Sequence, residues 1–343
     1  MGMELKLKDI FPERKSSLYG IPDTRINLEG KKIAISGGAG SIGSEIMLNL
    51  LKLKNSKIEI WDSDESRSHT LLVTLKNNEN LVSSSLVDIR DPISVNLAFE
   101  SFEPDILIHA AALKHVLALE IQPREAFLTN VIGTLNILNC IKKFHLESSL
   151  FISSDKAADP SSVLGATKLI GEQMWAHSAN TSDHNQNFSV VRFGNVFLSR
   201  GSVVETFLAQ LKNGEPITIT DPEMTRFFMD VDEAANLITY ILDKKIAGLS
   251  VLKMGEPIAI LELANRLAKF RNSKLETRII GTKKGEKLSE ILFAQSEHHL
   301  VTDRGFYLHS PFVNALPPEK IEGLNPKSHE EALRLIKQLL SFQ

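Results

Sequence analysis

The 343-residue sequence contains a single cysteine, Cys140, and no apolar run near the roughly 20 residues that cross a bilayer. One cysteine excludes an intramolecular disulfide and suits a reducing compartment. The first residues lack the charged-then-apolar pattern of a signal peptide. Histidines, cysteines and carboxylates do not occur at metal-ligand spacing. We therefore expect a cytoplasmic protein without a membrane span or a metal site.

A large excess of one charge is also missing, because the net charge is only −3. Such a balance gives no reason to expect nucleic acid or an anionic membrane as a partner. With 43% apolar residues, the chain can bury a substantial core. Its length suits one large α/β domain with a smaller lobe.

The most informative motif is the glycine-rich stretch SGGAGSIG at 36–43. It follows the apolar run 32–35 and precedes a helical pattern over 44–51, so a strand, a tight turn and a helix N-terminus are predicted in that order. Backbone N–H groups and the helix dipole then form a cradle for a pyrophosphate. The predicted dinucleotide contacts there are Gly37, Gly40, Ser41, Ile42 and Gly43.

The predicted strand 58–61 ends at Asp62, about 20 residues further on, where an acid can bind the diol of an adenosine ribose. A carboxylate repels a 2′-phosphate, which favours NAD, whereas nearby Arg67 leaves NADP open. A third strand is predicted at 86–89, with Asp88 and Ile89 at the adenine edge. The alternative for Asp88 is a simple strand-terminating aspartate.

Strand and helix patterns alternate through 106–108, 149–152 and 188–191, which predicts a Rossmann-type, doubly wound parallel sheet. We place an N-terminal arm at 1–29, the dinucleotide-binding domain at 30–194 and a substrate lobe at 195–300. A C-terminal extension at 301–343 contains a helix over 330–340.

Ligands of a parallel sheet gather at the carboxyl ends of its strands. One such end carries Ala110 and Ala111, small enough for a nicotinamide ribose to approach, with Lys114 close by. Another carries Asp155 and Lys156, which can act as acid and base if burial moves their pKa values toward neutrality. A surface ion pair is the alternative.

Several segments together resemble the nucleotide-sugar 4,6-dehydratases of the polysaccharide-biosynthesis group, within the extended short-chain dehydrogenase superfamily. The matching segments are SGGAGSIGSE at 36–45, HAAALKHV at 109–116, SSDKAADP at 153–160, LGATK at 164–168, VVRFGNVFLSRGSV at 190–203, DPEMTRFFM at 221–229 and GEKLSE at 285–290. They occur in the order of the family.

The resemblance implies that tightly bound NAD(P) oxidises the sugar at C4, that water leaves across C5 and C6, and that hydride returns to C6. By analogy, Lys156 removes the C5 proton and Asp155 protonates the C6 hydroxyl, with Ser154 as a hydrogen-bonding partner. Lys168 matches the lysine of the superfamily's Tyr-x-x-x-Lys pair and is expected to bind the nicotinamide ribose. UDP-N-acetylglucosamine is the implied substrate.

The chain departs from the superfamily at Leu164, which stands where a tyrosine normally deprotonates the hydroxyl being oxidised. Asp155 is then the candidate base for the 4-hydroxyl. Some members of the dehydratase group resemble this chain in carrying an apolar residue, methionine, at that place, so the loss of the tyrosine does not by itself imply loss of activity.

Substrate contacts are expected from side chains that can donate to phosphates and amides or bind a ribose. These are Lys114, Arg192, Asn195, Arg200, Thr225, Arg226 and Glu286, for each of which a structural role is the alternative. The resemblance also implies a homo-oligomer, with the 1–29 arm as a candidate contact.

Two other functions stay open. A nucleotide-sugar 4-epimerase shares the fold, the cofactor and the first oxidation, but needs no acid and base for elimination. A non-catalytic, NAD-binding regulatory protein is conceivable because of Leu164, although Asp155, Lys156 and Lys168 argue against it.

Overall fold

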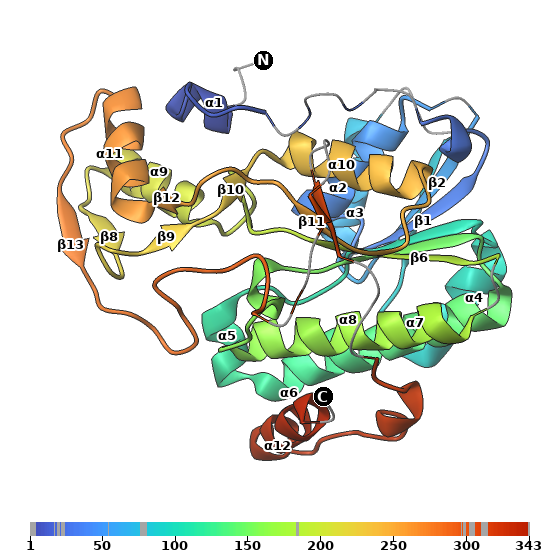
Figure 1. The fold of residues 1–343 in the computed structure, drawn as a ribbon. Helices are drawn as coiled ribbons and strands as arrows, with labels where there is room; N and C mark the ends of the chain where they lie inside the picture. The colour runs from blue at the N-terminus through green and yellow to red at the C-terminus, as the bar shows by residue number, and fades with distance from the viewer. Residues whose placement is uncertain are drawn as a thin grey trace.

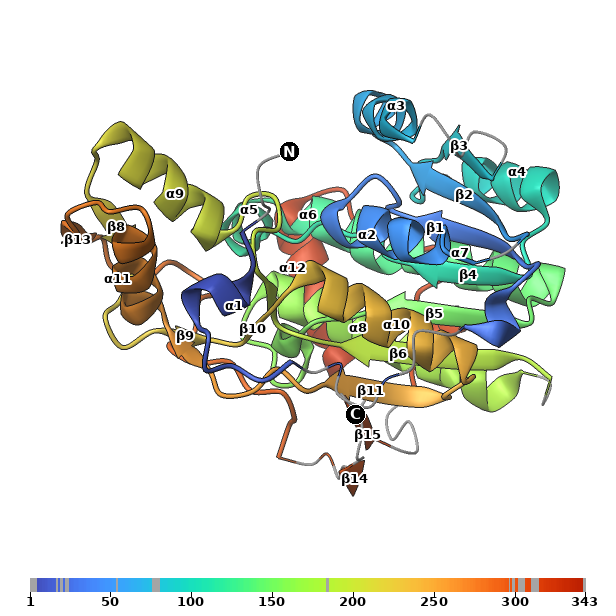
Figure 2. The same cartoon turned by 90° about the horizontal axis from the view of Figure 1, so that it is seen from above.

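The computed structural model describes residues 5–16, 18, 21, 25–53, 55–75, 81–182, 185–295, 297, 300–301, 306–309 and 315–341. Within these residues, nine strands form one sheet (Figure 1), in the order β14-β15-β11-β6-β5-β4-β1-β2-β3 (Figure 2). The strands are β1 Lys32–Ser36, β2 Lys57–Asp62, β3 Val82–Leu86, β4 Ile106–His109, β5 Ser148–Ile152, β6 Asn187–Arg192, β11 Gly248–Leu252, β14 Leu300–Val301 and β15 Phe306–His309. All pairs are parallel except those made by β15. The predicted Rossmann-type sheet is confirmed.

Helices cover both faces of this sheet and form part of the smaller lobe. They are α1 Leu7–Ile10, α2 Ser41–Leu50, α3 Glu65–Thr74, α4 Pro92–Phe102, α5 Val116–Ile121, α6 Pro123–Ala126, α7 Gly133–Phe144, α8 Val163–Thr181, α9 Val203–Asn213, α10 Val231–Asp243, α11 Ile260–Phe270 and α12 His329–Leu340. A π-helical stretch, η2 Phe127–Ile132, joins α6 to α7, and short 3-10 turns are η1 Ile26–Leu28, η3 Asp155–Ala157 and η4 Pro318–Lys320. No described helix is long and apolar enough to cross a membrane.

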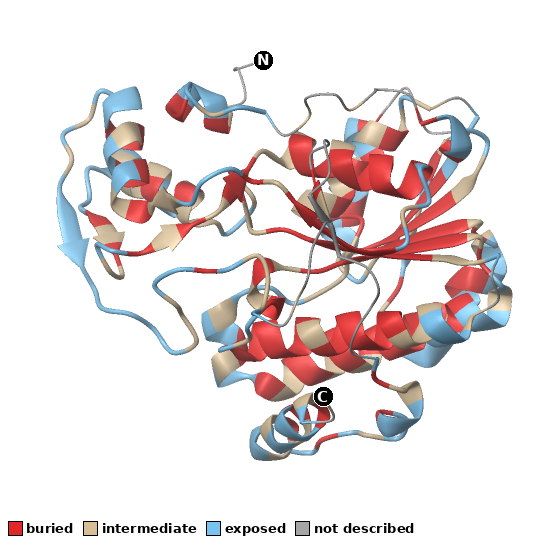
Figure 3. Cartoon of the chain, in the orientation of Figure 1, coloured by how far each residue is buried: buried red, intermediate tan, exposed pale blue. Residues whose placement is uncertain are grey.

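Two hydrophobic cores lie on opposite faces of the sheet. Helices α4, α7, α8 and α12 pack on one face, and α2 and α10 pack on the other. Strand β5 is buried along its whole length, including Ser148 and Ser149, because helices cover both faces of the sheet. Figure 3 shows the central part of the sheet as buried. Helix α8 is likewise buried for most of its length, since α12 covers the side away from the sheet.

A third core forms the small lobe around α9, α11 and β8. Its short strands are β7 Asn195–Val196, β8 Ile217–Ile219, β9 Thr225–Arg226, β10 Phe228–Met229, β12 Ile258–Ala259 and β13 Thr277–Ile279. Figure 2 shows this lobe standing at one end of the large sheet, beside the carboxyl ends of its central strands. This arrangement places the lobe next to the expected ligand edge.

The domain boundaries differ from the sequence-based ones. The chain leaves the sheet after β6 but returns in α10 and β11, and β11 pairs with β6. The predicted lobe 195–300 is therefore interrupted by an element of the large domain. The C-terminal extension is also integrated, since β15 pairs with β11 and α12 packs on the core. Hydrophobic patterning alone does not reveal such returns.

The N-terminal segment packs on its own chain. Leu7, Ile10 and Phe11 are buried in the core of the small lobe. Lys6 pairs with Asp232 and Arg14 with Glu233, both at the start of α10. The described part of the predicted arm therefore packs against the rest of its own chain. Residues 22–24 lie outside the described residues.

The third strand begins earlier than predicted. Strand β3 runs from Val82 to Leu86, so the predicted strand at 86–89 is wrong except for its first residue. Its middle is serine-rich, and Ser83 and Ser85 donate to Glu59 of β2. Polar cross-strand bonds thus replace the apolar pattern that would have marked the strand.

Candidate active site at the carboxyl edge of the sheet

The glycine-rich loop joins β1 to α2. Gly37 has φ +68°, and a Cβ atom there would lie 2.6 Å from the backbone nitrogen of Ala111. Only glycine allows this backbone to pass so close to the loop after β4. Gly40 is the N-cap of α2 and, among the described residues, no side chain caps this helix. Its first N–H groups are therefore available to an anion.

Asp62 lies at the end of β2 and faces the same loop. Its Oδ2 accepts from the backbone of Ala39 at 3.1 Å, and its Oδ1 accepts from that of Asp64 at 3.0 Å. Arg67, the residue that leaves NADP open, pairs with Asp64 at 3.0 Å. A guanidinium held by a carboxylate is a poorer partner for a 2′-phosphate, which favours NAD.

The adenine-edge residues lie just beyond β3. Asp88 is paired with Arg90 at 2.7 Å, and the Arg90 hydrogen bond holds the pKa of this carboxyl below its ordinary value. Ile89 is buried and its backbone carbonyl accepts from Asn136 of α7. The glycine cradle, the uncapped helix and Asp62 together fit a dinucleotide such as NAD.

His109 supports this loop from inside the protein. Its Nδ1 lies 2.6 Å from Ser36 Oγ, and its Nε2 lies 3.1 Å from Thr134 Oγ1. Complete burial, with a smaller contribution from Lys168, lowers the pKa of His109 to about 3. The neutral ring thus stacks with Phe151 and Trp175 as a structural element of the core.

Lys168 and Leu164 lie on the first turns of α8. Lys168 Nζ donates to the carbonyl of Ile152 and lies 4.1 Å from the centre of the Phe151 ring. Burial lowers the pKa of Lys168 to about 7, against an opposing contribution from Glu172. Leu164 is buried in the core formed with α7, as an apolar residue at that position requires.

This lowered pKa predicts a specific pH dependence of stability. The unfolded chain binds a proton at Lys168 up to about pH 10.5, while the NAD-free folded chain loses it near pH 7. Folded-state stability therefore rises with pH between these values. Lys168→Met removes this dependence, because methionine carries no charge that burial could penalise. We therefore expect the variant to gain stability relative to the wild type at pH 7, and this gain to shrink by about 1–2 kcal/mol between pH 7 and pH 9. Urea unfolding of the NAD-free proteins across this range measures it, and parallel curves would contradict it.

Asp155 and Lys156 form η3, directly after β5. Asp155 is buried, and its Oδ1 accepts from Lys156 Nζ and from Ser154 Oγ, both at 3.0 Å. The pair is thus a largely buried contact, so the alternative of a surface ion pair is wrong. Three of the predicted catalytic residues are brought together here.

The second oxygen of Asp155 is unusual. Among the described residues, Asp155 Oδ2 is buried without a hydrogen-bond partner. A Cβ atom on Gly194 would lie 2.8 Å from it, so only glycine leaves this oxygen room. An orphaned buried acceptor costs free energy, which makes it a natural place for a ligand hydroxyl.

Arg192 does not reach the candidate site as a free donor. Its guanidinium is fully buried, 2.7 Å from Glu172 and 2.8 Å from Glu297. Burial opposes its charge, but the two carboxylates outweigh this and raise the pKa of Arg192 above its ordinary value. Arg192 was expected to contact a phosphate, but in the structure it belongs to a buried ion network, because its N–H donors are already bound to Glu172 and Glu297.

Two further predicted substrate residues hold a loop. Arg226 donates to the carbonyls of Lys287 and Leu288, and Thr225 Oγ1 lies 2.9 Å from Ser289 Oγ. They fasten the segment 283–297, which runs from the small lobe back toward α5 and α8 (Figure 1). Glu286 lies in this segment and accepts from the backbone of Lys283. Asn195 is the first residue of β7. It follows Gly194, which lies beside the Asp155 carboxylate.

Arg200 lies against the glycine-rich loop. Its guanidinium donates to the carbonyl of Ala39, and its backbone N–H donates to Ser41 Oγ. Lys114 Nζ in turn donates to the carbonyl of Arg200. This arrangement connects the small lobe with the dinucleotide loop.

Three buried residues near the site escaped sequence reasoning. Glu290 lies 3.5 Å from Lys156, and Glu172 accepts from both Ser153 and Arg192. Asn130 lies in the π-helical stretch. Its side chain accepts a hydrogen bond from the backbone N–H of Leu113 and donates one to the Leu113 carbonyl, and it thereby fixes the loop after β4. Only Glu290 had a signal, since it ends the quoted segment GEKLSE.

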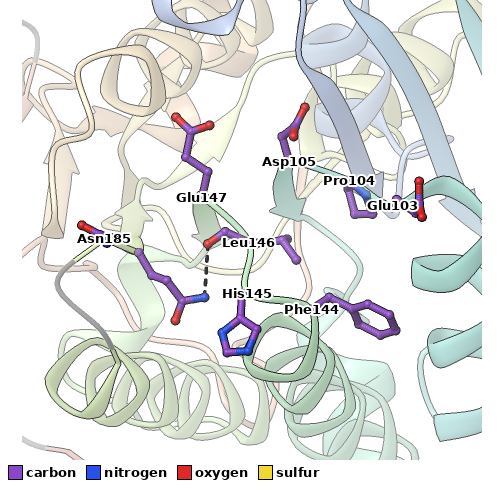
Figure 4. A pocket seen from close by; sticks show the side chains of 9 residues that line it. Glu103, Pro104, Asp105, Phe144, His145, Leu146, Glu147 and Asn185 are labelled. Carbon is purple, nitrogen blue, oxygen red and sulfur yellow. Dashed lines mark hydrogen bonds between the residues drawn. The ribbon is translucent and has the colours of Figure 1, made fainter.

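A separate cavity of about 640 Å³ lies at the opposite edge of the sheet (Figure 4). It is lined by the turns that precede β4, β5 and β6, including Asp105 and Glu147. Asp105 accepts from the backbone of Lys32, and Glu147 pairs with Lys31 and Lys245. Its acids are therefore engaged within the protein, and the cavity is remote from Asp155.

Known proteins resemble the chain in sequence. The capsular polysaccharide biosynthesis protein CapD of Staphylococcus aureus is 37% identical over 280 residues, covering 79% of this chain and 46% of CapD, so the chain spans about half of that relative. A UDP-N-acetylglucosamine 4,6-dehydratase (inverting) of Campylobacter jejuni is 32% identical, covering 86% of this chain and 87% of the relative. A UDP-glucose 4-epimerase of Rickettsia canadensis is 33% identical, covering 82% and 83%.

A comparison with solved structures and a match to a family of sequences agree with these relatives. The protein Pen from Bacillus thuringiensis superposes with a TM-score of 0.79 at 30% identity, covering 86% of this chain and 98% of Pen. The sequence model described as "Polysaccharide biosynthesis protein" matches residues 33–310. The chain therefore belongs to this polysaccharide-biosynthesis family, within the extended short-chain dehydrogenase superfamily.

Proposed function

We propose that this protein is a nucleotide-sugar 4,6-dehydratase that acts on UDP-N-acetylglucosamine. The family supports the coarser assignment, an NAD-dependent enzyme that modifies a nucleotide sugar for polysaccharide biosynthesis. The observation that carries the finer one is the buried pair of Asp155 and Lys156, with an unpartnered Asp155 oxygen beside Gly194. An epimerase needs no such acid and base.

The residues of this chain divide the proposed chemistry among them. NAD, if bound in the cradle, would supply a reversible acceptor for the hydride exchanged at C4 and C6. Asp155 receives the proton of the 4-hydroxyl, directly or through water. Lys156 takes the proton from C5, and the C5–H electron pair forms the C5–C6 double bond. Asp155 gives its proton to the C6 oxygen, so that the C6–O bond breaks and water leaves. Protonated Lys156, which exchanges with solvent, returns a proton to C5 when C6 gains its hydride.

Side chains around the pair hold these groups in place. Ser154 orients Asp155. Lys168, which contacts the Ile152 carbonyl and the Phe151 ring, would bind the nicotinamide ribose. Gly37, Gly40, Ser41, Ile42 and Gly43 would hold the pyrophosphate, and Asp62 the adenosine ribose. Arg200 and Lys114 border this cradle and would contact phosphates.

The test is incubation of the purified protein with UDP-N-acetylglucosamine and NAD in deuterated water, followed by NMR and mass spectrometry. Loss of water, a new C6 methyl group and deuterium at C5 are expected. An intact sugar with inverted C4 would identify an epimerase, which the 33% identity to the Rickettsia protein makes the second candidate. An unchanged sugar would contradict both.

A further inference from the structure

Lys156 has a second carboxylate partner besides Asp155. Glu290 Oε1 lies 3.5 Å from Lys156 Nζ, and only 4% of the Glu290 side chain is exposed. Burying a carboxylate is costly unless it is paired with a charge. Among the described residues, Lys156 is the ion-pair partner of Glu290. The buried Glu290 carboxylate therefore has the Lys156 amine as its counter-charge.

The segment that carries Glu290 is fixed on both sides of it. Arg226 donates to the carbonyls of Lys287 and Leu288, just before Glu290. Arg192 donates to the carbonyl of Leu292, just after it. Both arginines are buried. Glu290 is thus held at the amine by the protein around it, although its segment has no regular secondary structure.

The charges around Lys156 come from several elements. Asp155 precedes it in η3, and Glu290 faces it from the 283–297 segment. Lys168 of α8 binds the carbonyl of Ile152, and Glu172 of the same helix is taken by Ser153 and Arg192. Lys287 is paired with Asp159. The two carboxylates that contact the amine are therefore Asp155 and Glu290.

We propose that Glu290 is a positioning residue for Lys156: it holds the amine against Asp155 and stabilises the ammonium that forms when Lys156 accepts a proton. The second part rests on the proposed function. When the C5–H bond breaks, a new N–H bond makes Lys156 positive, and the adjacent Glu290 carboxylate compensates that charge. Asp155 cannot supply this charge while it still holds the proton taken from the 4-hydroxyl, because its carboxyl is then neutral.

The charge effect is testable without turnover. Because an opposite charge favours the ammonium, Glu290→Gln is expected to lower the pKa of Lys156 by about one unit. Competitive acetylation with acetic anhydride across pH 6–11, read at the Lys156 peptide by mass spectrometry, measures this pKa in the NAD-bound full chain. Glu276→Gln serves as the matched control, since Glu276 is exposed and pairs with exposed Lys274. An unchanged Lys156 pKa in Glu290→Gln would overturn the proposal.

Kinetics of the same proteins test the second part. Glu290→Gln is expected to lower kcat for dehydration by about ten- to a hundredfold with KM within threefold, and to move the rising limb of its pH profile to lower pH. Glu290→Asp, which keeps the charge, should retain a Lys156 pKa closer to that of the wild type and recover part of kcat. If Glu290→Gln fails to fold, Glu290→Ala takes its place, and wild-type values of both the Lys156 pKa and kcat in that charge-free variant would refute the role.

The proposal and the proposed function fail in different ways. If the wild-type protein makes no C6 methyl group, the proposed dehydratase activity is refuted. Acetylation of Lys156 then still tests whether Glu290 holds the amine and favours its protonated form. A wild-type dehydratase whose Lys156 pKa and pH profile are unmoved by Glu290→Gln refutes the role of Glu290 alone.

Discussion

Lys156→Met is expected to lower the rate of water elimination by about 10²- to 10⁴-fold, because it removes the proposed base for the C5 proton. Methionine keeps most of the apolar stem, so the side chain can still pack beside η3. Oxidation at C4 does not require this amine and should persist, seen as absorbance of reduced cofactor at 340 nm. Turnover is measured as formation of the C6 methyl group by NMR.

The matched control is Lys274→Met, which removes a lysine whose side chain is 85% exposed. It should leave turnover unchanged. Since Lys156→Met leaves Asp155 and Glu290 without their shared cation, its melting temperature should be measured alongside. Deuterium exchange at C5 with near-normal turnover in a folded Lys156→Met protein would show that another group removes the proton.

Those parts of the fold that depend on local pattern were predictable. The glycine loop from Gly37, the strand ending at Asp62 and the strand before Asp155 all occur where the sequence places them. Each is an apolar run followed by a turn, and parallel strands in such a sheet end at one edge. Local sequence therefore sufficed to bring Ser154, Asp155 and Lys156 to the edge that faces ligands.

Residues whose environment is created by distant parts of the chain were harder to interpret. Arginine suits a phosphate, so Arg192 looked like a ligand, but it ends a buried strand between apolar neighbours. Its partners lie 20 and 105 residues away in the sequence. Glu290 was missed for the same reason, because an irregular segment has no periodicity from which to infer its destination.

Arg192→Met is expected to destabilise the protein by about 3–5 kcal/mol at pH 8, since it leaves the buried Glu172 and the partly buried Glu297 without their cation. Burial disfavours the charged form of a carboxylate that has lost its cation. The folded state then takes up protons more readily than the unfolded chain, so the deficit should shrink as pH falls from 8 to 5. Urea unfolding at several pH values measures this trend.

The exposed Arg334 of α12 is the matched control, and Arg334→Met should change stability by less than about 0.5 kcal/mol. The pH trend separates the two roles considered for Arg192. A phosphate ligand would leave the stability of the free protein intact and weaken the binding of UDP in calorimetry. If Arg192 is a structural cation, its replacement lowers the stability of the free protein.

The loss of the Arg192 guanidinium also releases the carbonyl of Leu292, close to Glu290 in the sequence. Arg192→Met should therefore lower kcat as well, because the segment that positions Lys156 loses one of its two anchors.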